Sequence, residues 1–260
     1  MASGEVDDIQ VEKSIGTLAA YAFVTKTTTE DSFDLHRLVS LSMRNWLQKE
    51  DVATAYATEV VMRLNSIFPA PDYVNKDIWL SYLPHTRHVL SSPVISKGIV
   101  AKAQLLGHVA RAFLLWGNYR DSEQHQEQEL ELNKLLFGKE HPETLTSMGN
   151  LARVLDRQGK YEEAEKMLRQ TLELEEKVLG KEHPDTLTCM HCLAYVLQNE
   201  EKYMESEQWY ELALMLNEKV LGGDHPSTIR TTDNFAAMLR KQGARSQASD
   251  DVAFPLDKGR

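Results

Sequence analysis

Apolar side chains recur at helical spacing through the middle of the chain. From His141 onwards they follow steps of three and four, stop at residues 158–160, and then resume at steps of four until Gly180. Such spacing places apolar side chains on one face of a helix, and the interruption contains a glycine that suits a turn. Pro142 is favourable in the first turn of a helix, and Gly180 directly after a helix end. The pattern predicts a helix–turn–helix hairpin over residues 141–179.

The hairpin pattern returns at a fixed step. The segment that begins at Gly138 recurs from Gly180 and, with substitutions, from Gly222, each time 42 residues later. Rows of small and large residues keep the same step: Ala110, Ala152, Ala194 and Ala236 in one row, and Phe113, Leu155, Leu197 and Leu239 in another. A period of about 20 to 50 residues is typical of stacked repeat proteins, in which each unit buries its apolar face against the next.

The period also sets the number of units. We expect complete hairpins at about 96–137, 141–179 and 183–221, and the first helix of a fourth at 226–242. The second helix of that fourth unit is expected to decay, because Asp250, Asp251 and Pro255 leave little room for a regular helix. The predicted fold class is therefore mostly α, an α-solenoid of about 3.5 helical hairpins.

Residues 1–92 do not follow the repeat. Their patterns predict helices at 11–21, 37–49, 52–67 and 76–91, with a β-hairpin made of 22–27 and 32–35. Helix, hairpin and helix in this order are the back half of a winged-helix domain. The expected organisation is a partial winged-helix segment over 1–50, a helical linker over 51–93, the repeat array over 94–245 and a frayed or disordered tail over 246–260.

Composition narrows the classes of partner. The chain has 260 residues and a formal net charge of −10, which disfavours general binding to nucleic acid or anionic lipid. No apolar run approaches the roughly 20 residues that cross a bilayer, and residues 1–10 lack the build of a signal peptide. Two cysteines make no disulfide framework. We expect a cytoplasmic protein that binds neither nucleic acid nor membrane, and the sequence leaves its oligomeric state open.

The repeat unit resembles a known family. The segments Asn150-Leu151-Ala152 and Gly159-Lys160-Tyr161-Glu162-Glu163-Ala164-Glu165 resemble the tetratricopeptide repeat (TPR), and the 42-residue step with its His-Pro link resembles the kinesin-light-chain variety. The amino-acid sequence within the repeats is similar to that of the repeats in fungal receptors of the nucleotide-binding, NLR-like (STAND) class. This resemblance implies a non-enzymatic scaffold, the sensor or interaction end of such a receptor, which binds a protein or peptide and holds no cofactor.

The N-terminal segment resembles the end of the nucleotide-binding module in the same receptors. His36 matches the histidine of a Met-His-Asp-like motif that senses nucleotide phosphates, whereas Leu35 and Arg37 depart from that motif. The chain contains no Gly-x-x-x-x-Gly-Lys-Ser/Thr loop to cradle phosphates. We therefore expect His36 to lack the family's function here, and the chain to be the rear part of a receptor or a remnant of its gene.

In this repeat class the first helix of each hairpin lines the concave side. The side chains of those helices that point away from the packed face are therefore the candidate partner-binding residues. By the 42-residue step they include His108, Arg111, Asn150, Arg153, Arg157, Tyr195, Asn199 and Asn234, and Arg230 and Arg240 lie on the same strip. This strip is polar and basic in an otherwise acidic chain, which favours an acidic peptide, and its asparagines suit the backbone of an extended one.

Other interpretations of these residues are weaker. Cys189 and Cys192 have the spacing of a zinc-ligand pair, but no second pair follows, so we expect a packing role and no metal site. The His-Pro pairs are spread one per repeat and are expected to cap helices. No nucleophile–base pair supports an enzyme. A cargo adaptor like kinesin light chain is the alternative function, although residues 1–92 lack the heptads that precede the repeats in that family.

Overall fold

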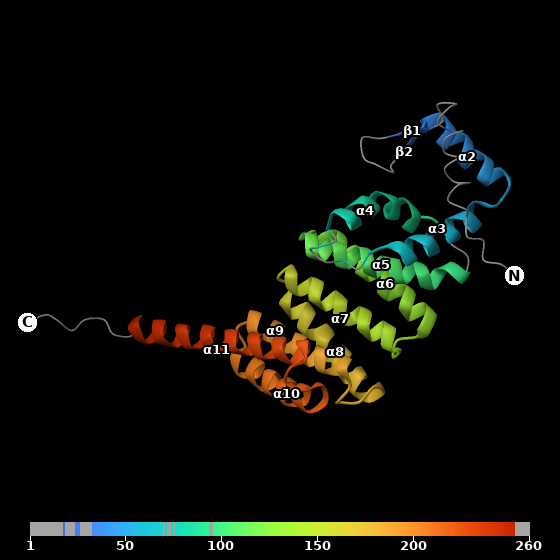
Figure 1. The fold of residues 1–260 in the computed structure, drawn as a ribbon. Helices are drawn as coiled ribbons and strands as arrows, with labels where there is room; N and C mark the ends of the chain where they lie inside the picture. The colour runs from blue at the N-terminus through green and yellow to red at the C-terminus, as the bar shows by residue number, and fades with distance from the viewer. Residues whose placement is uncertain are drawn as a thin grey trace, which may run out of the picture.

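The computed structural model describes residues 18, 24–26, 33–69, 71, 74, 76–93 and 96–252. Its elements in chain order are β1 (Val24–Lys26), β2 (Phe33–Leu35), α2 (Arg37–Lys49), α3 (Ala53–Ile67), α4 (Lys76–Leu90), α5 (Ser96–Trp116), α6 (Tyr119–Phe137), α7 (Pro142–Arg157), α8 (Tyr161–Val178), α9 (Pro184–Asn199), α10 (Tyr203–Leu221) and α11 (Pro226–Val252). Figure 1 shows the helices from α5 onwards stacked in layers, with β1, β2 and α2 at one end of the stack and α11 at the other.

The three complete hairpins lie where the sequence predicts them. α5 pairs with α6, α7 with α8 and α9 with α10, and the second helix of each hairpin also packs on the first helix of the next unit. α11 begins a fourth unit and packs on α10 and α9. The predicted α-solenoid of TPR-like hairpins is therefore confirmed.

The helices that follow the His-Pro pairs begin in one way. His141, His183 and His225 precede them, and the ring Nδ1 of each accepts the backbone N–H two residues later at 3.2 Å. A proline occupies the first position of each of these helices. Because a helix start leaves its first amide groups unpaired, the imidazole satisfies one of them. The prediction that the His-Pro pairs cap helices is confirmed.

The turn inside each hairpin requires one residue in the left-handed backbone region. Gly117 and Gly159 have φ of 82° and 79°, which glycine adopts without strain. Glu201 stands at the equivalent place in the third hairpin and has φ of 65°. A side chain there is disfavoured by about 1–2 kcal/mol, so the packing of α9 on α10 imposes this turn against local preference.

Small residues lie where the two helices of a hairpin cross. Ala152 and Ala164 are fully buried between α7 and α8. Ser122 and Ser206 occupy the position of Ala164 in the neighbouring hairpins, and each hydroxyl donates at 2.8 Å to a carbonyl of the facing helix. A serine is tolerated at this crossing because its buried hydroxyl group forms a hydrogen bond there.

A buried polar pair joins each hairpin to the next. The amide of Asn133 donates to the hydroxyl of Ser147 at 2.8 Å, and Asn217 donates to Thr231 at 3.3 Å. In the middle repeat the equivalent residues are Glu175 and Cys189, both buried. Burial raises the pKa of Glu175 to about 7, and its Oε2 has no hydrogen-bond partner. The middle junction therefore holds a carboxyl group where its neighbours hold neutral amides.

The end of the array differs from the sequence prediction. The 42-residue step places a turn at Gly243, and the tail is expected from residue 246. α11 instead continues through Gly243 to Val252 without a break. No second helix follows α11 within the described residues, so no opposing packed surface forces the chain to turn at this point, and the glycine stays helical. Residues 253–260 lie outside the described residues.

The N-terminal predictions are tested only in part. The antiparallel pair β1–β2, which joins Val24 to Leu35 in register, and helix α2 agree with the expected hairpin and helix. The helix expected at 11–21 lies outside the described residues except for Leu18, so the winged-helix assignment stays a prediction. α3 and α4 match the two linker helices. The α2 side chains Leu38 and Trp46 are exposed.

One described helix is long and apolar enough to span a membrane by length and composition. This segment of α5, from Lys97 to Trp116, has a mean hydropathy of 1.2. It packs against α3 and α6, and Leu105, Leu106 and Val109 are buried there. We interpret it as the central helix of the first layer, which accounts for its apolar composition.

Truncating equivalent leucines tests the solenoid packing. Leu197 on α9 is fully buried, whereas Leu239, one repeat later on α11, is 41% exposed. We expect Leu197→Ala to lower the free energy of unfolding by about 2–5 kcal/mol through lost burial and a cavity, and Leu239→Ala by less than about 1 kcal/mol. Urea unfolding followed by circular dichroism measures both. Equal losses would contradict the layered packing.

The Glu175 carboxyl makes stability depend on pH. Its folded-state pKa of about 7 exceeds the ordinary value of 4.5, so between these values the folded chain binds more protons than the unfolded one. The contribution of this group to the free energy of unfolding therefore falls as pH rises through that window and stays constant above it. We expect Glu175→Gln to stabilise the protein at pH 8 and to lose that advantage towards pH 4.5. Glu173→Gln, at an exposed position of the same helix, should leave the profile unchanged in denaturant melts.

Candidate functional site

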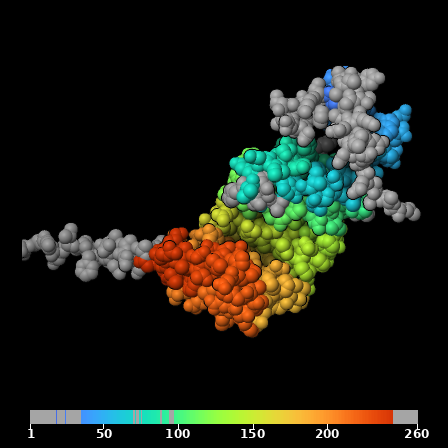
Figure 2. Space-filling model, in the orientation of Figure 1, coloured from blue at the N-terminus to red at the C-terminus, as the bar shows by residue number. Residues whose placement is uncertain are grey.

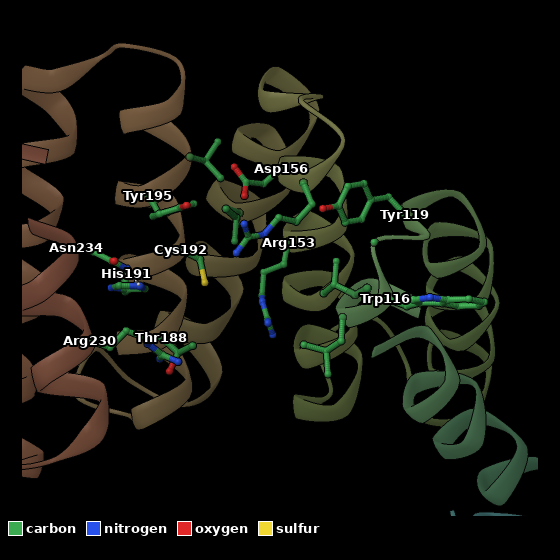
Figure 3. Close-up of a pocket in the computed structure, with 16 residues that line it drawn as sticks. Trp116, Tyr119, Arg153, Asp156, Thr188, His191, Cys192, Tyr195, Arg230 and Asn234 are labelled. Carbon is green, nitrogen blue, oxygen red and sulfur yellow. Dashed lines mark hydrogen bonds between the residues drawn. The ribbon is translucent and has the colours of Figure 1, made fainter. Parts of the chain in front are cut away.

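A pocket of about 540 Å³ opens between the first helices of successive hairpins. Residues of α7, α9 and α11 line it, together with the end of α5 and the start of α6. Figure 3 shows Arg153 and Asp156 on one side, facing Cys192 and Tyr195 across the pocket. The solenoid thus creates a hollow on the side where equivalent helices of three layers meet.

The structure brings together half of the predicted binding residues. Those that line the pocket are Arg153, Arg157, Tyr195, Arg230 and Asn234. Those that do not are His108, Arg111, Asn150, Asn199 and Arg240. Five of the ten predicted residues therefore line the hollow, and they are five of its 16 lining residues.

Arg111 and His108 contact neighbouring side chains in and beside the first layer. Arg111 is half-buried and interacts electrostatically with Glu129 of α6. Burial raises the pKa of Glu129 to about 7, and its carboxylate fills the space beside Gly107, where a Cβ would lie 2.6 Å from Oε1. His108 stacks on Phe68 of the α3–α4 connection with the ring centroids 6.2 Å apart. Contacts with α6 and with the α3–α4 connection therefore occupy this stretch of the strip.

Asn199 is held by a buried carboxylate. Its amide Nδ2 donates to Oδ1 of Asp156 at 2.7 Å. Asp156 is 8% exposed, and burial raises its pKa, while the Asn199 hydrogen bond and the charges of Arg157 and Arg153 oppose that rise. The amide nitrogen expected to pair with a bound chain is thus committed to fastening α9 to α7.

His191 is at the centre of a second buried network. Its Nε2 lies 3.2 Å from the amide of Asn234 and its Nδ1 3.1 Å from the hydroxyl of Thr231, which itself donates to the Ser227 carbonyl. These partners assign an acceptor Nε2 and a protonated Nδ1. Burial, with the charges of Arg230 and Arg153, lowers the pKa of His191 to about 4. The imidazole is therefore neutral at pH 7 and orients Asn234 at the pocket.

Three arginines give the pocket its charge. Within the part of the chain that the structure describes, Arg153, Arg157 and Arg230 form no ion pair. Arg153 approaches only the Asn150 oxygen, at 3.5 Å. The single carboxylate in the lining, Asp156, is buried and hydrogen-bonded. With three arginines and one aspartate in its lining, the pocket carries a net positive charge in a chain whose net charge is −10.

Several lining residues were not predicted from the sequence. Trp116 and Tyr119 flank the turn between α5 and α6 and supply an aromatic wall, seen at the right of Figure 3. Thr188, His191 and Asp156 also belong to the lining. The repeated tyrosine at the turn was a visible signal for Tyr119. Asp156 and His191 had none, because their equivalents in other repeats are of other types, such as Gln198 and Gly149.

The remaining candidate residues are the two cysteines and His36, for which the structure indicates structural roles. Cys189 is buried and its Sγ lies 3.5 Å from the Leu168 carbonyl, whereas Cys192 lines the pocket. Burial raises the pKa of both thiols. Among the described residues no group of three or more His, Cys, Asp or Glu side chains is placed to hold a metal ion. His36 caps α2, because its Nδ1 accepts the Leu38 N–H at 3.3 Å.

Comparisons with known proteins agree with this architecture. The tetratricopeptide repeat family matches residues 101–177 and 185–251, more than half of the chain. A protein of the fungus Hyaloscypha variabilis, described as nucleotide-binding leucine-rich repeat (NLR)-like, is 39% identical over 147 residues, which are 56% of this chain and 14% of that protein. The chain therefore spans about a seventh of this relative's length.

Solved structures share the fold. Two crystal structures from Podosopora anserina, described as a kinesin light chain with nearly identical TPR-like repeats, give TM-scores of 0.53 and 0.51 at 21% and 22% identity; both cover 75% of this chain, and 89% and 90% of theirs. BtubC (BKLC) from P. vanneervenii gives 0.54 at 14% identity and covers 82% of this chain and 96% of its own. At these identities the likeness concerns the fold alone.

Removing the Asn199 amide tests the inner network. Asn199→Ala leaves the buried Asp156 carboxylate without its donor, so we expect a loss of about 1–3 kcal/mol in the free energy of unfolding at pH 7. Asn150→Ala, which removes an amide with only a long contact, should change it by less than about 0.5 kcal/mol. Thermal and urea unfolding of the two variants measure the difference. Indistinguishable variants would argue that Asp156 is solvated.

Proposed function

Because the chain belongs to the tetratricopeptide repeat family, we propose that it is a non-enzymatic scaffold that binds an extended, acidic peptide of a partner protein in the pocket between α7, α9 and α11. The observation that carries this proposal is the set of arginines without ion pairs, Arg153, Arg157 and Arg230, around a hollow between the first helices of successive hairpins. Guanidinium groups bind carboxylates through short, charge-assisted hydrogen bonds.

The rest of the lining suits a peptide. Asn234 is oriented by the neutral His191 ring and offers an amide group to a peptide backbone. Trp116 and Tyr195 present flat apolar surface, and Trp116 is 52% exposed. A peptide with an acidic side chain at the arginines and an apolar side chain at Trp116 would contact both the basic and the apolar parts of the pocket. The volume of about 540 Å³ is in the range that holds a few side chains.

The titratable groups of the pocket favour binding over catalysis. His191 uses both ring nitrogens in hydrogen bonds and stays neutral. Asp156 is held by Asn199, and the raised pKa of Cys192 keeps its thiol protonated. A general base or a nucleophile needs a free, suitably titrating group within reach of substrate. The candidates in this lining are each used in packing, which supports a scaffold.

We further propose that this scaffold is the interaction end of a fungal NLR-like receptor. The Hyaloscypha variabilis relative, at 39% identity, supports this assignment. The alternative is an adaptor like kinesin light chain, to which the solved structures compare at 22% identity or less. Genomic sequence upstream distinguishes the two: a nucleotide-binding module favours the receptor, and a heptad coiled coil favours the adaptor.

Peptide selection tests the binding pocket. We expect twelve-residue peptides selected from a random phage library on the immobilised chain to be enriched in Asp and Glu. Arg153→Glu and Arg230→Glu should each weaken a selected peptide roughly tenfold or more in fluorescence anisotropy, because charge reversal replaces attraction by repulsion. The dissociation constant of the wild type should rise with salt.

The matched control is Arg87→Glu, an equal charge change at an exposed position of α4, outside the pocket. Unchanged affinity in both pocket variants, or selected peptides without acidic enrichment, would refute the proposed mode of binding. Circular dichroism of each variant confirms that the array remains folded.

A further inference from the structure

The outer face of α11 is the uncovered end of the array. One flank of α11 packs on α10 and α9, and no described helix lies against the other. Figure 2 shows α11 in red on the surface at this end of the molecule. Four residues at steps of three and four define the uncovered flank, which we call the open stripe: Ile229, Thr232, Ala236 and Leu239.

The same positions are buried in the complete repeats. Leu187 and Leu197, one repeat before Ile229 and Leu239, are 1% and 0% exposed, whereas Ile229 is 49% exposed and Leu239 41%. Ala194, the equivalent of Ala236, is fully buried. The open stripe thus corresponds to an interior surface of the solenoid, and no helix among the described residues covers it. Contiguous exposed apolar side chains of this kind mark a place where another molecule binds.

The covering helix is known from the other hairpins. α8 covers α7 and presents Ala164 at the close crossing, with Leu168 and Leu172 four and eight residues later, all buried. α10 covers α9 with Ser206 and the buried Tyr210 at the first two of these positions. The spacing is that of one helical face. The surface on α11 is continuous with this repeating interface and has the same rows of side chains.

We propose that the open stripe docks an acidic amphipathic helix of a partner protein, with a small residue followed by leucines four and eight positions later. This inference concerns a different surface from the pocket and stands independently of the proposed function.

The composition of the covering helices supports the acidic character of this helix. α8, the covering helix of the second hairpin, carries twice as many glutamates as lysines and arginines. The Nε of Arg240 donates to the Ala236 carbonyl at 3.1 Å, which places its guanidinium beside the stripe. Asp233 lies on the same flank as Arg240, whereas Arg230 lines the pocket. A glutamate-rich helix can bring a carboxylate to Arg240.

The one polar residue of the stripe is no obstacle to docking. The hydroxyl of Thr232 donates to the Thr228 carbonyl in its own helix at 3.0 Å. Its donor is therefore already satisfied when a partner helix excludes water, and burial leaves no unpaired hydrogen. Ala236 leaves room for the backbone of the partner to approach, as Ala194 does for α10.

A peptide with the sequence of residues 161–178 is the probe, because it carries the α8 pattern and acidic character. We expect the full chain to bind the fluorescein-labelled peptide saturably in anisotropy titrations. Leu239→Asp should weaken binding roughly tenfold or more, since it places a carboxylate in the apolar interface. Met215→Asp on α10 is the matched control, because Met215 is 58% exposed and lies outside the stripe. A peptide with Leu168→Asp and Leu172→Asp should not bind.

The outcomes separate the possible occupants. No saturable binding by the folded wild type, or equal affinity of the wild type and Leu239→Asp, overturns the proposal. A dimer in sedimentation that Leu239→Asp abolishes assigns the stripe to a second copy and also overturns it. Unchanged binding of the probe peptide by Arg153→Glu supports a surface separate from the pocket, whereas a matching loss there overturns that separation.

Discussion

The structure depends on the close crossing of two helices inside each hairpin. Ala152 against Ala164, and the equivalent alanines and serines, remove side-chain volume at one point so that the flanking leucines of both helices can interlock. Dense packing rewards this match only when the rows recur at the same step in every unit. The fixed 42-residue period of the sequence meets that requirement.

Polar groups inside the array follow the same repetition, with one change in the middle. The amides of Asn133 and Asn217 are neutral and donate to hydroxyl groups, whereas Glu175 stands at the equivalent junction without a basic partner. The low dielectric of the junction keeps its carboxyl protonated over part of the accessible pH range. The second and third hairpins thus meet at a junction whose charge state varies near neutral pH.

Stacking also decides which polar side chains remain available. Asn199 and Asp156 satisfy each other, and the network of His191, Thr231 and Asn217 joins α9 to the following layers. Among the described residues, the guanidinium groups of the pocket and the uncovered flank of α11 remain available for binding. The two candidate surfaces therefore consist of side chains that the packing of the described layers leaves accessible.

The sequence by itself determined the complete hairpins, their boundaries and the histidine caps, because these follow from local periodicity and turn chemistry. Only the tertiary structure decided which groove residues are free. Arg111 and Arg153 are equivalent by repeat, yet one lies against Glu129 in the first layer and the other lines the pocket. It also decided that Gly243 stays within α11. Periodicity specifies a residue's face on its own helix, whereas neighbouring layers determine whether that face is covered, and those neighbours are distant in sequence.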